Sequence, residues 1–135
     1  MHSCLIIDDE NRSIETLSKI ILTYCENQLE ILGIANNIEE AYPLILSKKP
    51  DIVFLDIEMP FGSGFDLLER FDSIDFQVIF TTGFDQYAIT AIKFSALDYL
   101  LKPINIQEVK DAVEKAIKNI ATNNITNNFK ILLES

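Results

Sequence analysis

The sequence predicts a doubly wound α/β fold, in which helices cover both faces of a parallel β-sheet. Short apolar runs rich in Ile, Val, Leu and Phe alternate with segments of helical periodicity, and this alternation repeats five times. The apolar runs are continuous, as expected of strands that are buried on both faces. Because ligands of parallel sheets bind at the carboxyl ends of the strands, functional residues are expected at those ends.

Four of the apolar runs end in polar groups suited to phosphate chemistry. These groups are Asp8 with Asp9, Asp56, Thr82 and Lys102. One acidic residue after a strand is ordinary, but carboxylates, a hydroxyl and a lysine at the same end of four strands need a shared explanation. The sequence therefore predicts an active site at this edge of the sheet.

The first part of the chain is expected to form two strand and helix pairs. A strand at residues 4–7 precedes apolar residues at helical spacing over residues 12–27, and a second strand follows at residues 30–35. A second helix is expected after Asn37. Pro43 lies inside its pattern and lacks a backbone donor, so it is expected to kink this helix or delay its start.

The middle of the chain repeats the same pattern. Pro50 precedes a third strand at residues 52–55, which places Asp56 at a corner between strand and loop. The loop at residues 57–64 leads into a helix whose apolar side chains are Phe65, Leu67, Leu68 and Phe71.

The last two units follow a fourth strand at residues 78–80. Asp85 can cap a helix, and a fifth strand is expected at residues 97–101. Asn105, with Glu108 three residues later, resembles a capping box at the start of the final helix.

The end of the chain is predicted to be a linker. From Asn119 onward the helical pattern gives way to a run of Asn and Thr with low helix propensity. Beyond it, residues 129–133 have strand-like character. This segment is either a terminal extension that docks on the domain or the first strand of a further domain, and the pattern favours neither.

The composition of the 135 residues fits one globular domain. No apolar run approaches the roughly 20 residues of a membrane span and no basic region precedes the first strand, so we expect a cytoplasmic protein without a membrane partner. Cys4 and Cys25 lack metal-ligand spacing and are expected to be buried thiols. A net charge of −10 with scattered Lys and Arg argues against nucleic-acid binding by this segment.

The acidic residues at the sheet edge require either protonation of one carboxylate or a cation that neutralises the group. Carboxylates about 4–5 Å apart repel by about 3–4 kcal/mol per pair at an effective dielectric constant near 20. A site with few ligands, all of them oxygen, suits Mg²⁺ completed by a phosphate. Lys102 would supply a charge to that phosphate and Thr82 a hydrogen bond, which together favour phosphoryl transfer. Asp56 is the expected nucleophile, since carboxylates form acyl phosphates.

These residues fall within longer motifs: Asp-Asp-Glu at 8–10, Asp-Ile-Glu-Met-Pro at 56–60 followed by Gly64, Thr-Thr-Gly at 81–83, and Ala-Leu-Asp-Tyr-Leu-Leu-Lys-Pro at 96–103. The set resembles the receiver domain of two-component response regulators, with the CheY-like, flavodoxin-like fold and strand order 2-1-3-4-5. The resemblance implies a receiver domain at residues 1–121. It leaves residues 122–135 as a linker or the start of a C-terminal effector domain that binds DNA.

The resemblance also implies a role for each site residue. Asp56 would accept phosphate from a histidine kinase or phosphotransfer protein. Asp9, Asp56 and the Glu58 carbonyl would bind Mg²⁺, with Asp8 assisting through water. Thr82 and Lys102 would contact the phosphate, and Tyr99 would be the switch aromatic.

Further expectations follow from the same resemblance. The Lys102–Pro103 peptide bond should be cis. Glu58 and Phe84, each two residues after a site residue, would flank the path of attacking water and set the phosphate lifetime. The amino-acid sequence around Thr82 and Tyr99 is similar to that of receivers in the LytTR class of transcription regulators. Phosphorylation would then alter the face of the fourth helix, fifth strand and fifth helix, which would pair two receivers as a homodimer.

Three alternatives stay open. A haloacid-dehalogenase-type phosphohydrolase also uses an aspartate and Mg²⁺, but its family requires Asp-x-Asp at the first strand, where this chain has Asp-Asp-Glu. A docking module without phosphorylation should lack a member of the cluster, and none is missing. The receiver could also be a stand-alone CheY-like relay.

Glu10 is interpreted as a helix-start acid and His2 as a frayed terminal residue.

Overall fold

The computed structural model describes residues 1–84 and 98–134, with side chains up to residue 123. The helix expected after Asp85 lies outside the described residues. The described elements are β1 (His2–Ile7), α1 (Asn11–Tyr24), β2 (Leu29–Ala35), α2 (Ile38–Lys48), β3 (Ile52–Asp56), α3 (Gly64–Glu69), β4 (Gln77–Thr82), β5 (Asp98–Leu101) and α5 (Ile106–Glu134).

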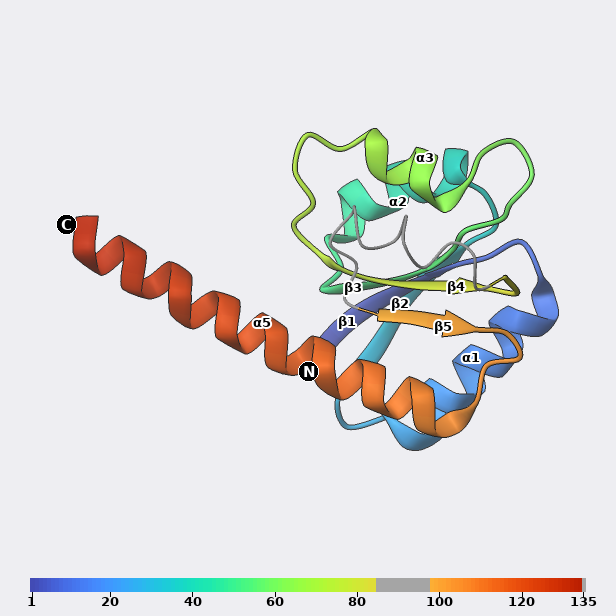
Figure 1. The fold of residues 1–135 in the computed structure, drawn as a ribbon, viewed down its shortest axis with the longest axis horizontal. Helices are drawn as coiled ribbons and strands as arrows, with labels where there is room; N and C mark the ends of the chain where they lie inside the picture. Colours follow the sequence, from blue (N-terminus) through green and yellow to red (C-terminus); the bar gives the residue numbers. More distant parts are fainter. Residues whose placement is uncertain (85–97, 135) are drawn as a thin grey trace.

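The strands form one parallel sheet in the order β2-β1-β3-β4-β5. Figure 1 shows α2 and α3 on one face of this sheet and α1 and α5 on the other. The predicted doubly wound α/β fold and its strand order are therefore confirmed. The register pairs Asp56 with Thr81, and Thr82 with Leu101. It thus aligns the carboxyl ends of β3, β4 and β5 along one edge.

The core consists of two apolar layers, one on each face of the sheet. Cys4, Ile6 and Phe54 pack with α1 and α5, whereas Leu5 and Leu55 pack with α2 and α3. Successive side chains of a strand point to opposite faces, so a strand buried on both faces needs an unbroken apolar run. This double burial explains the continuous runs in the sequence.

Two helices end earlier than their apolar spacing predicts. The first ends at Tyr24 rather than at residue 27, because the Cys25 carbonyl accepts hydrogen bonds from Gln28 and Leu29 and so reverses the chain. The third ends at Glu69, yet the partly buried Phe71 still packs against the core, where its ring contacts those of Tyr42 and Phe76.

Pro43 does not delay the start of α2. The helix begins directly after Asn37, whose side chain accepts a hydrogen bond from the Glu40 backbone N–H at 2.9 Å. Pro43 is the sixth residue of the helix, inside its second turn. The cap therefore fixes the helix start more strongly than the missing donor of Pro43 opposes it.

The predicted linker is wrong in its local structure, because α5 continues as a helix to Glu134. The start is as predicted, with the Asn105 side chain accepting a hydrogen bond from the Glu108 N–H at 2.8 Å. Its first turns pack on the sheet, and its last turns project away from the domain (Figure 1). Extending an established helix adds one hydrogen bond for each residue fixed, which offsets the low propensity of Asn and Thr.

Three other sequence expectations concern His2, the two cysteines and membrane-spanning segments. His2 is not frayed: it lies in β1, with Nδ1 3.6 Å from Oδ2 of Asp51. Cys4 and Cys25 are buried free thiols, as predicted. Burial raises the pKa of Cys4 to about 12, so this thiol is unreactive at neutral pH. Among the described residues, no helix is long and apolar enough to cross a membrane.

Candidate functional site at the carboxyl edge of the sheet

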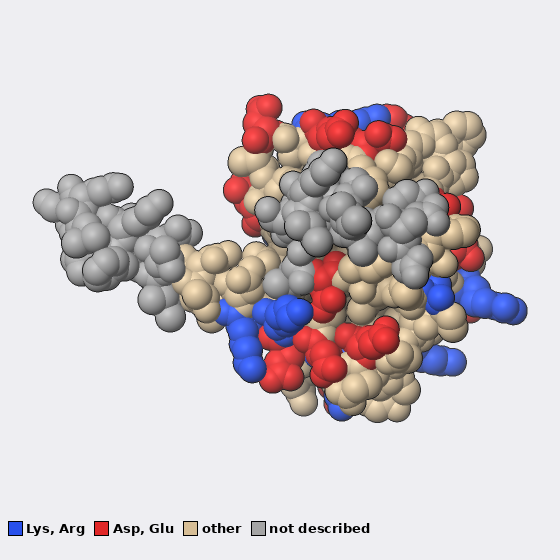
Figure 2. Space-filling view, in the orientation of Figure 1, with Lys and Arg blue, Asp and Glu red and all other residues tan. Residues whose placement is uncertain are grey.

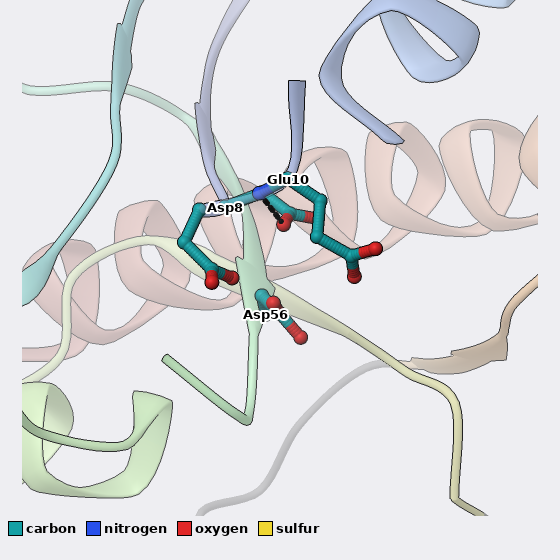
Figure 3. A group of neighbouring side chains, drawn as sticks. Asp8, Glu10 and Asp56 are labelled. Atoms are coloured by element: carbon teal, nitrogen blue, oxygen red, sulfur yellow. Dashed lines mark hydrogen bonds between the residues drawn. The ribbon is translucent and has the colours of Figure 1, made fainter. Parts of the chain in front are cut away.

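The carboxyl ends of β1 and β3 bring three acidic side chains together (Figure 3). Asp8 and Glu10 follow β1, and Asp56 is the last residue of β3. Asp8 and Asp56 retain only 3% and 2% of their accessible surface, whereas Asp9 and Glu10 are exposed. The predicted cluster at this edge of the sheet is therefore present, with two of its carboxylates in the protein interior.

Backbone hydrogen bonds hold Asp8 in place. Its N–H donates to the Ala35 carbonyl of β2 at 3.0 Å, and its own carbonyl accepts a bond from the Asn36 side chain at 3.1 Å. Its carboxylate accepts the Glu10 N–H at 2.9 Å (Figure 3), which closes a tight turn between β1 and α1. The position of Asp8 is thus set by its neighbours in the sheet.

Asp56 is fixed by the close approach of a glycine. A Cβ atom added at Gly64 would lie 2.6 Å from the Asp56 carbonyl oxygen, so only glycine fits there. The Gly64 N–H donates to the Ile57 carbonyl, and the Ile57 N–H donates to the Thr81 carbonyl of β4. The loop after β3 is therefore folded tightly against the strand that carries Asp56.

Lys102 reaches the acidic cluster from the end of β5. Its Nζ lies 2.6 Å from Oε1 of Glu10, 3.1 Å from Oδ2 of Asp8 and 3.4 Å from Oδ2 of Asp56. The Lys102 N–H donates to the Thr82 carbonyl at 2.7 Å, which ties the start of this loop to β4. The Lys102–Pro103 peptide bond is cis, as expected.

The charges at this edge shift two pKa values. Burial, followed by the adjacent charge of Asp8, raises the pKa of Asp56 to about 8, against the opposing effect of Lys102. Burial lowers the pKa of Lys102, but the hydrogen bond to Glu10 and the charges of Asp56 and Asp8 outweigh it and leave that pKa raised. One ammonium group therefore does not neutralise the carboxylates around it.

The donor set of the cluster fits a hard divalent cation. Asp8, Asp9, Glu10 and Asp56 each offer a carboxylate oxygen, and these oxygens all lie within 4.8 Å of one another. Such oxygen donors, with negative charge left uncompensated, are typical of Mg²⁺ sites. Glu10 belongs to this group although the sequence pattern indicated only a helix-start acid. Its place next to Asp8 and Asp9 was the available signal.

Thr82 connects Glu58 to Tyr99 through the backbone of Phe84. The Thr82 hydroxyl is fully buried, donates to Oε1 of Glu58 at 3.3 Å and accepts the Phe84 N–H at 3.2 Å. The Tyr99 hydroxyl donates to the Phe84 carbonyl. A chain of polar contacts thus runs from the residue two positions after Asp56 to the half-buried Tyr99 of β5.

The predicted residues at the carboxyl edge of the sheet are Asp8, Asp9, Asp56, Thr82 and Lys102, which end or directly follow their strands. Tyr99 is instead the second residue of β5 and pairs with Phe80. The Phe84 side chain is 50% exposed, and its backbone N–H is bound to the Thr82 hydroxyl. On the face drawn in Figure 2, Lys and Arg side chains lie among acidic ones and form no continuous basic patch.

Comparison with known proteins identifies the family. The family model described as "Response regulator receiver domain" matches residues 4–114. An "Uncharacterized response regulatory protein" of Vibrio cholerae is 40% identical over 119 residues, which cover 87% of this chain and 49% of that protein. "Sensory transduction protein LytT" of Enterococcus faecalis is 36% identical over 118 residues, covering 86% and 48%.

A solved structure gives the same result. The REC domain of AraT, a response regulator from Geobacillus stearothermophilus, superposes with a TM-score of 0.82 at 31% identity, covering 91% of this chain and 98% of that one. The fold and the site define an α/β protein with an acidic, lysine-containing centre at the carboxyl edge of its sheet. The chain belongs to the response regulator receiver domain family, as a receiver of a two-component system. It spans about half the length of the curated relatives it matches.

Proposed function

We propose that this receiver is a phosphoacceptor whose Asp56 takes a phosphoryl group from a histidine kinase or phosphotransfer protein. One observation carries the proposal: Asp56 is buried at the end of β3, with Asp8 and the Lys102 ammonium group beside it. A buried carboxylate with this surplus of negative charge is costly unless a cation and a phosphate complete the site.

The transfer is an in-line displacement at phosphorus. A carboxylate oxygen of Asp56 attacks the phosphorus of a phosphohistidine, and a new P–O bond forms an acyl phosphate. The P–N bond breaks, and its electron pair returns to the donor imidazole. Lys102 pairs with the phosphoryl oxygens, and the Thr82 hydroxyl donates a hydrogen bond to them.

Mg²⁺ fits the donors present at this site. Asp9, Asp56 and the backbone carbonyl of Glu58 would hold it, with Asp8 contributing through a water molecule. When bound, Mg²⁺ neutralises the carboxylates and the phosphoryl oxygens. The carboxylate oxygens of Asp8, Asp9 and Asp56, which lie within 4.8 Å of one another, support this assignment.

Output follows from a shift between two arrangements of Thr82 and Tyr99. Phosphate draws the Thr82 hydroxyl away from Glu58, which loosens the Phe84 backbone that the Tyr99 hydroxyl contacts. This shift alters the face formed by the fourth helix, β5 and α5, which pairs two receivers as a homodimer. The fourth helix lies outside the described residues.

The regulated process is transcription, through a DNA-binding domain that follows the receiver in a cytoplasmic protein. Similarity to LytT proteins and to the LytTR class supports this assignment. A stand-alone relay is the other possibility, in which the last part of α5, residues 122–134, connects to no effector domain.

Incubation with Mg²⁺ and acetyl phosphate, followed by intact-mass measurement, tests the proposal. We expect a single phosphoryl group on the parent chain and on Asp72→Asn, a control at an exposed aspartate, and none on Asp56→Asn or in EDTA. Phosphorylation that persists in Asp56→Asn would overturn the assignment. Continuous release of inorganic phosphate over many rapid turnovers would favour the hydrolase alternative.

A further inference from the structure

We propose that Glu10 holds Lys102 away from Asp56 in the unphosphorylated receiver and so limits the stability of the phosphorylated form. This inference rests on the proposed function. It makes Glu10 a positioning residue that acts through Lys102. In this arrangement the lysine must leave Glu10 before it can pair fully with a phosphoryl group on Asp56.

The first observation is the geometry of Lys102. Its shortest ion pair is with Glu10, at 2.6 Å, whereas Asp56 lies at 3.4 Å. The Glu10 contact is within the range of a strong charge-assisted hydrogen bond, and the Asp56 contact is longer than that range. Lys102 therefore binds Glu10 more closely than it binds Asp56, the proposed nucleophile.

The second observation is that Glu10 does not perform the function its position suggests. It occupies the N-cap position of α1, yet its side chain makes no capping hydrogen bond. Its backbone N–H is bound to the Asp8 carboxylate, which fixes the turn and directs the Glu10 side chain over the site (Figure 3). The carboxylate is thus available to Lys102 and not to the helix.

The third observation is the difference in exposure between the two partners. The side chain of Glu10 is 57% exposed, whereas that of Lys102 is 14% exposed. When Lys102 turns to a phosphoryl group, the carboxylate it leaves is hydrated at little cost, because it already borders solvent. Asp8, whose side chain is 5% exposed, lacks this option. Glu10 is therefore the partner that Lys102 can exchange.

The exchange sets a population balance. A contact made only in the unphosphorylated form opposes phosphorylation by its own free energy. Beryllofluoride with Mg²⁺, a mimic of the phosphoryl group, should then bind more tightly when the contact is removed. In Glu10→Gln the amide oxygen is still an acceptor for Lys102 but has no charge, so we expect about three- to tenfold tighter binding, roughly the difference between a charge-assisted and a neutral hydrogen bond. Glu15→Gln, the same change at an exposed glutamate of α1, should bind like the parent.

A double-mutant cycle separates action through Lys102 from general repulsion. Fluorine NMR gives the beryllofluoride affinity of Glu10→Gln, Lys102→Met and the double variant. The gain from Glu10→Gln should vanish in the Lys102→Met background, because the group that Glu10 holds is gone. A gain of equal size in both backgrounds would overturn the proposal, since Glu10 would then act only by its charge.

Mg²⁺ affinity gives the second discriminating measurement. A positioning role predicts that Glu10→Gln weakens Mg²⁺ binding much less than Asp9→Asn, which removes an assigned ligand. Mg²⁺ binding weakened as much as in Asp9→Asn, or unchanged beryllofluoride affinity in Glu10→Gln, would overturn the role given to Glu10 and leave the proposed function intact. A parent chain that binds no beryllofluoride and is not phosphorylated at Asp56 would overturn the proposed function, and this inference with it.

Discussion

The Thr82 hydroxyl oxygen lies 3.3 Å from Oε1 of Glu58, so the buried end of β4 is bound to the residue two positions after Asp56. Glu58 is exposed and Thr82 is fully buried, which makes the carboxylate the partner that can move away. The same hydroxyl accepts the Phe84 N–H at 3.2 Å. The contact with Glu58 therefore competes with any hydrogen bond that Thr82 would donate to a phosphoryl group on Asp56.

Removing the acceptor at residue 58 should favour the phosphorylated form. In Glu58→Ala the Thr82 hydroxyl is released, and we expect about two- to tenfold tighter binding of beryllofluoride with Mg²⁺, the range of one hydrogen bond. Glu58→Gln is the matched control, because its amide oxygen can still accept the hydroxyl. Equal gains in both variants would assign the effect to charge and contradict a role for the hydrogen bond.

Phe84 should lengthen the lifetime of the acyl phosphate. Phe84 follows Thr82 by two residues and its side chain is 50% exposed, so we expect the ring to obstruct water that approaches Asp56. Its N–H and carbonyl contact Thr82 and Tyr99 through the backbone, and Phe84→Ala leaves both groups in place. We expect faster loss of phosphate from Phe84→Ala, followed by intact mass after removal of the donor, and a near-parental rate for Phe84→Leu. Equal rates in Phe84→Ala and the parent would show that the ring does not shield the site.

The raised pKa of Asp56 predicts a pH-dependent stability in EDTA. Its carboxyl group has a pKa of about 8 in the folded protein against an ordinary value of 3.8. The folded state therefore binds more protons than the unfolded state between these values, and this contribution to stability is lost as the pH rises through about 8. Asp56→Asn carries no such group. The difference in unfolding free energy between this variant and the parent should therefore grow in favour of the variant up to about pH 8, and stay constant above it.

Urea unfolding at about pH 5 to about pH 9 in EDTA measures this difference, which we expect to reach on the order of 1–3 kcal/mol. Saturating Mg²⁺ should reduce it, because the parent then gains a stabilising cation that the variant binds less well. Asp72→Asn serves as the control and should follow the parent at every pH. A parent whose stability relative to Asp56→Asn does not change over this range would contradict the raised pKa.

The strand-end residues of the site could be predicted from the sequence because topology fixes them. Once the strands are parallel, Asp8, Asp56, Thr82 and Lys102 must lie at one edge, whatever the details of the loops. The helix at the chain end could not be predicted in this way. Local propensity indicated a linker, whereas extension of α5 from its packed first turns outweighs that propensity.

The partners of Glu10 and Glu58 could not be predicted because they depend on side-chain direction in the folded protein. Glu10 and Lys102 are 92 residues apart in the sequence, and an acidic residue before a helix fits a cap equally well. Their contact depends on the turn that the Asp8 carboxylate closes with the Glu10 N–H. The motifs thus identify the groups at the strand ends, whereas only the structure shows that Glu10 binds Lys102 and Glu58 binds Thr82.

Two glycines near the site should respond oppositely to the same substitution. A Cβ at Gly64 would meet the Asp56 carbonyl oxygen at 2.6 Å, and backbone cannot give way there without moving Asp56. A Cβ at Gly83 would meet nothing within 4 Å. We expect Gly64→Ala to lower the unfolding free energy by about 1–3 kcal/mol, the usual cost of overpacking, and to slow phosphorylation of Asp56. Gly83→Ala should stay within about 0.5 kcal/mol of the parent. Urea unfolding checks both values, and a Gly64→Ala variant as stable as Gly83→Ala would show that the loop after β3 can move away from Asp56.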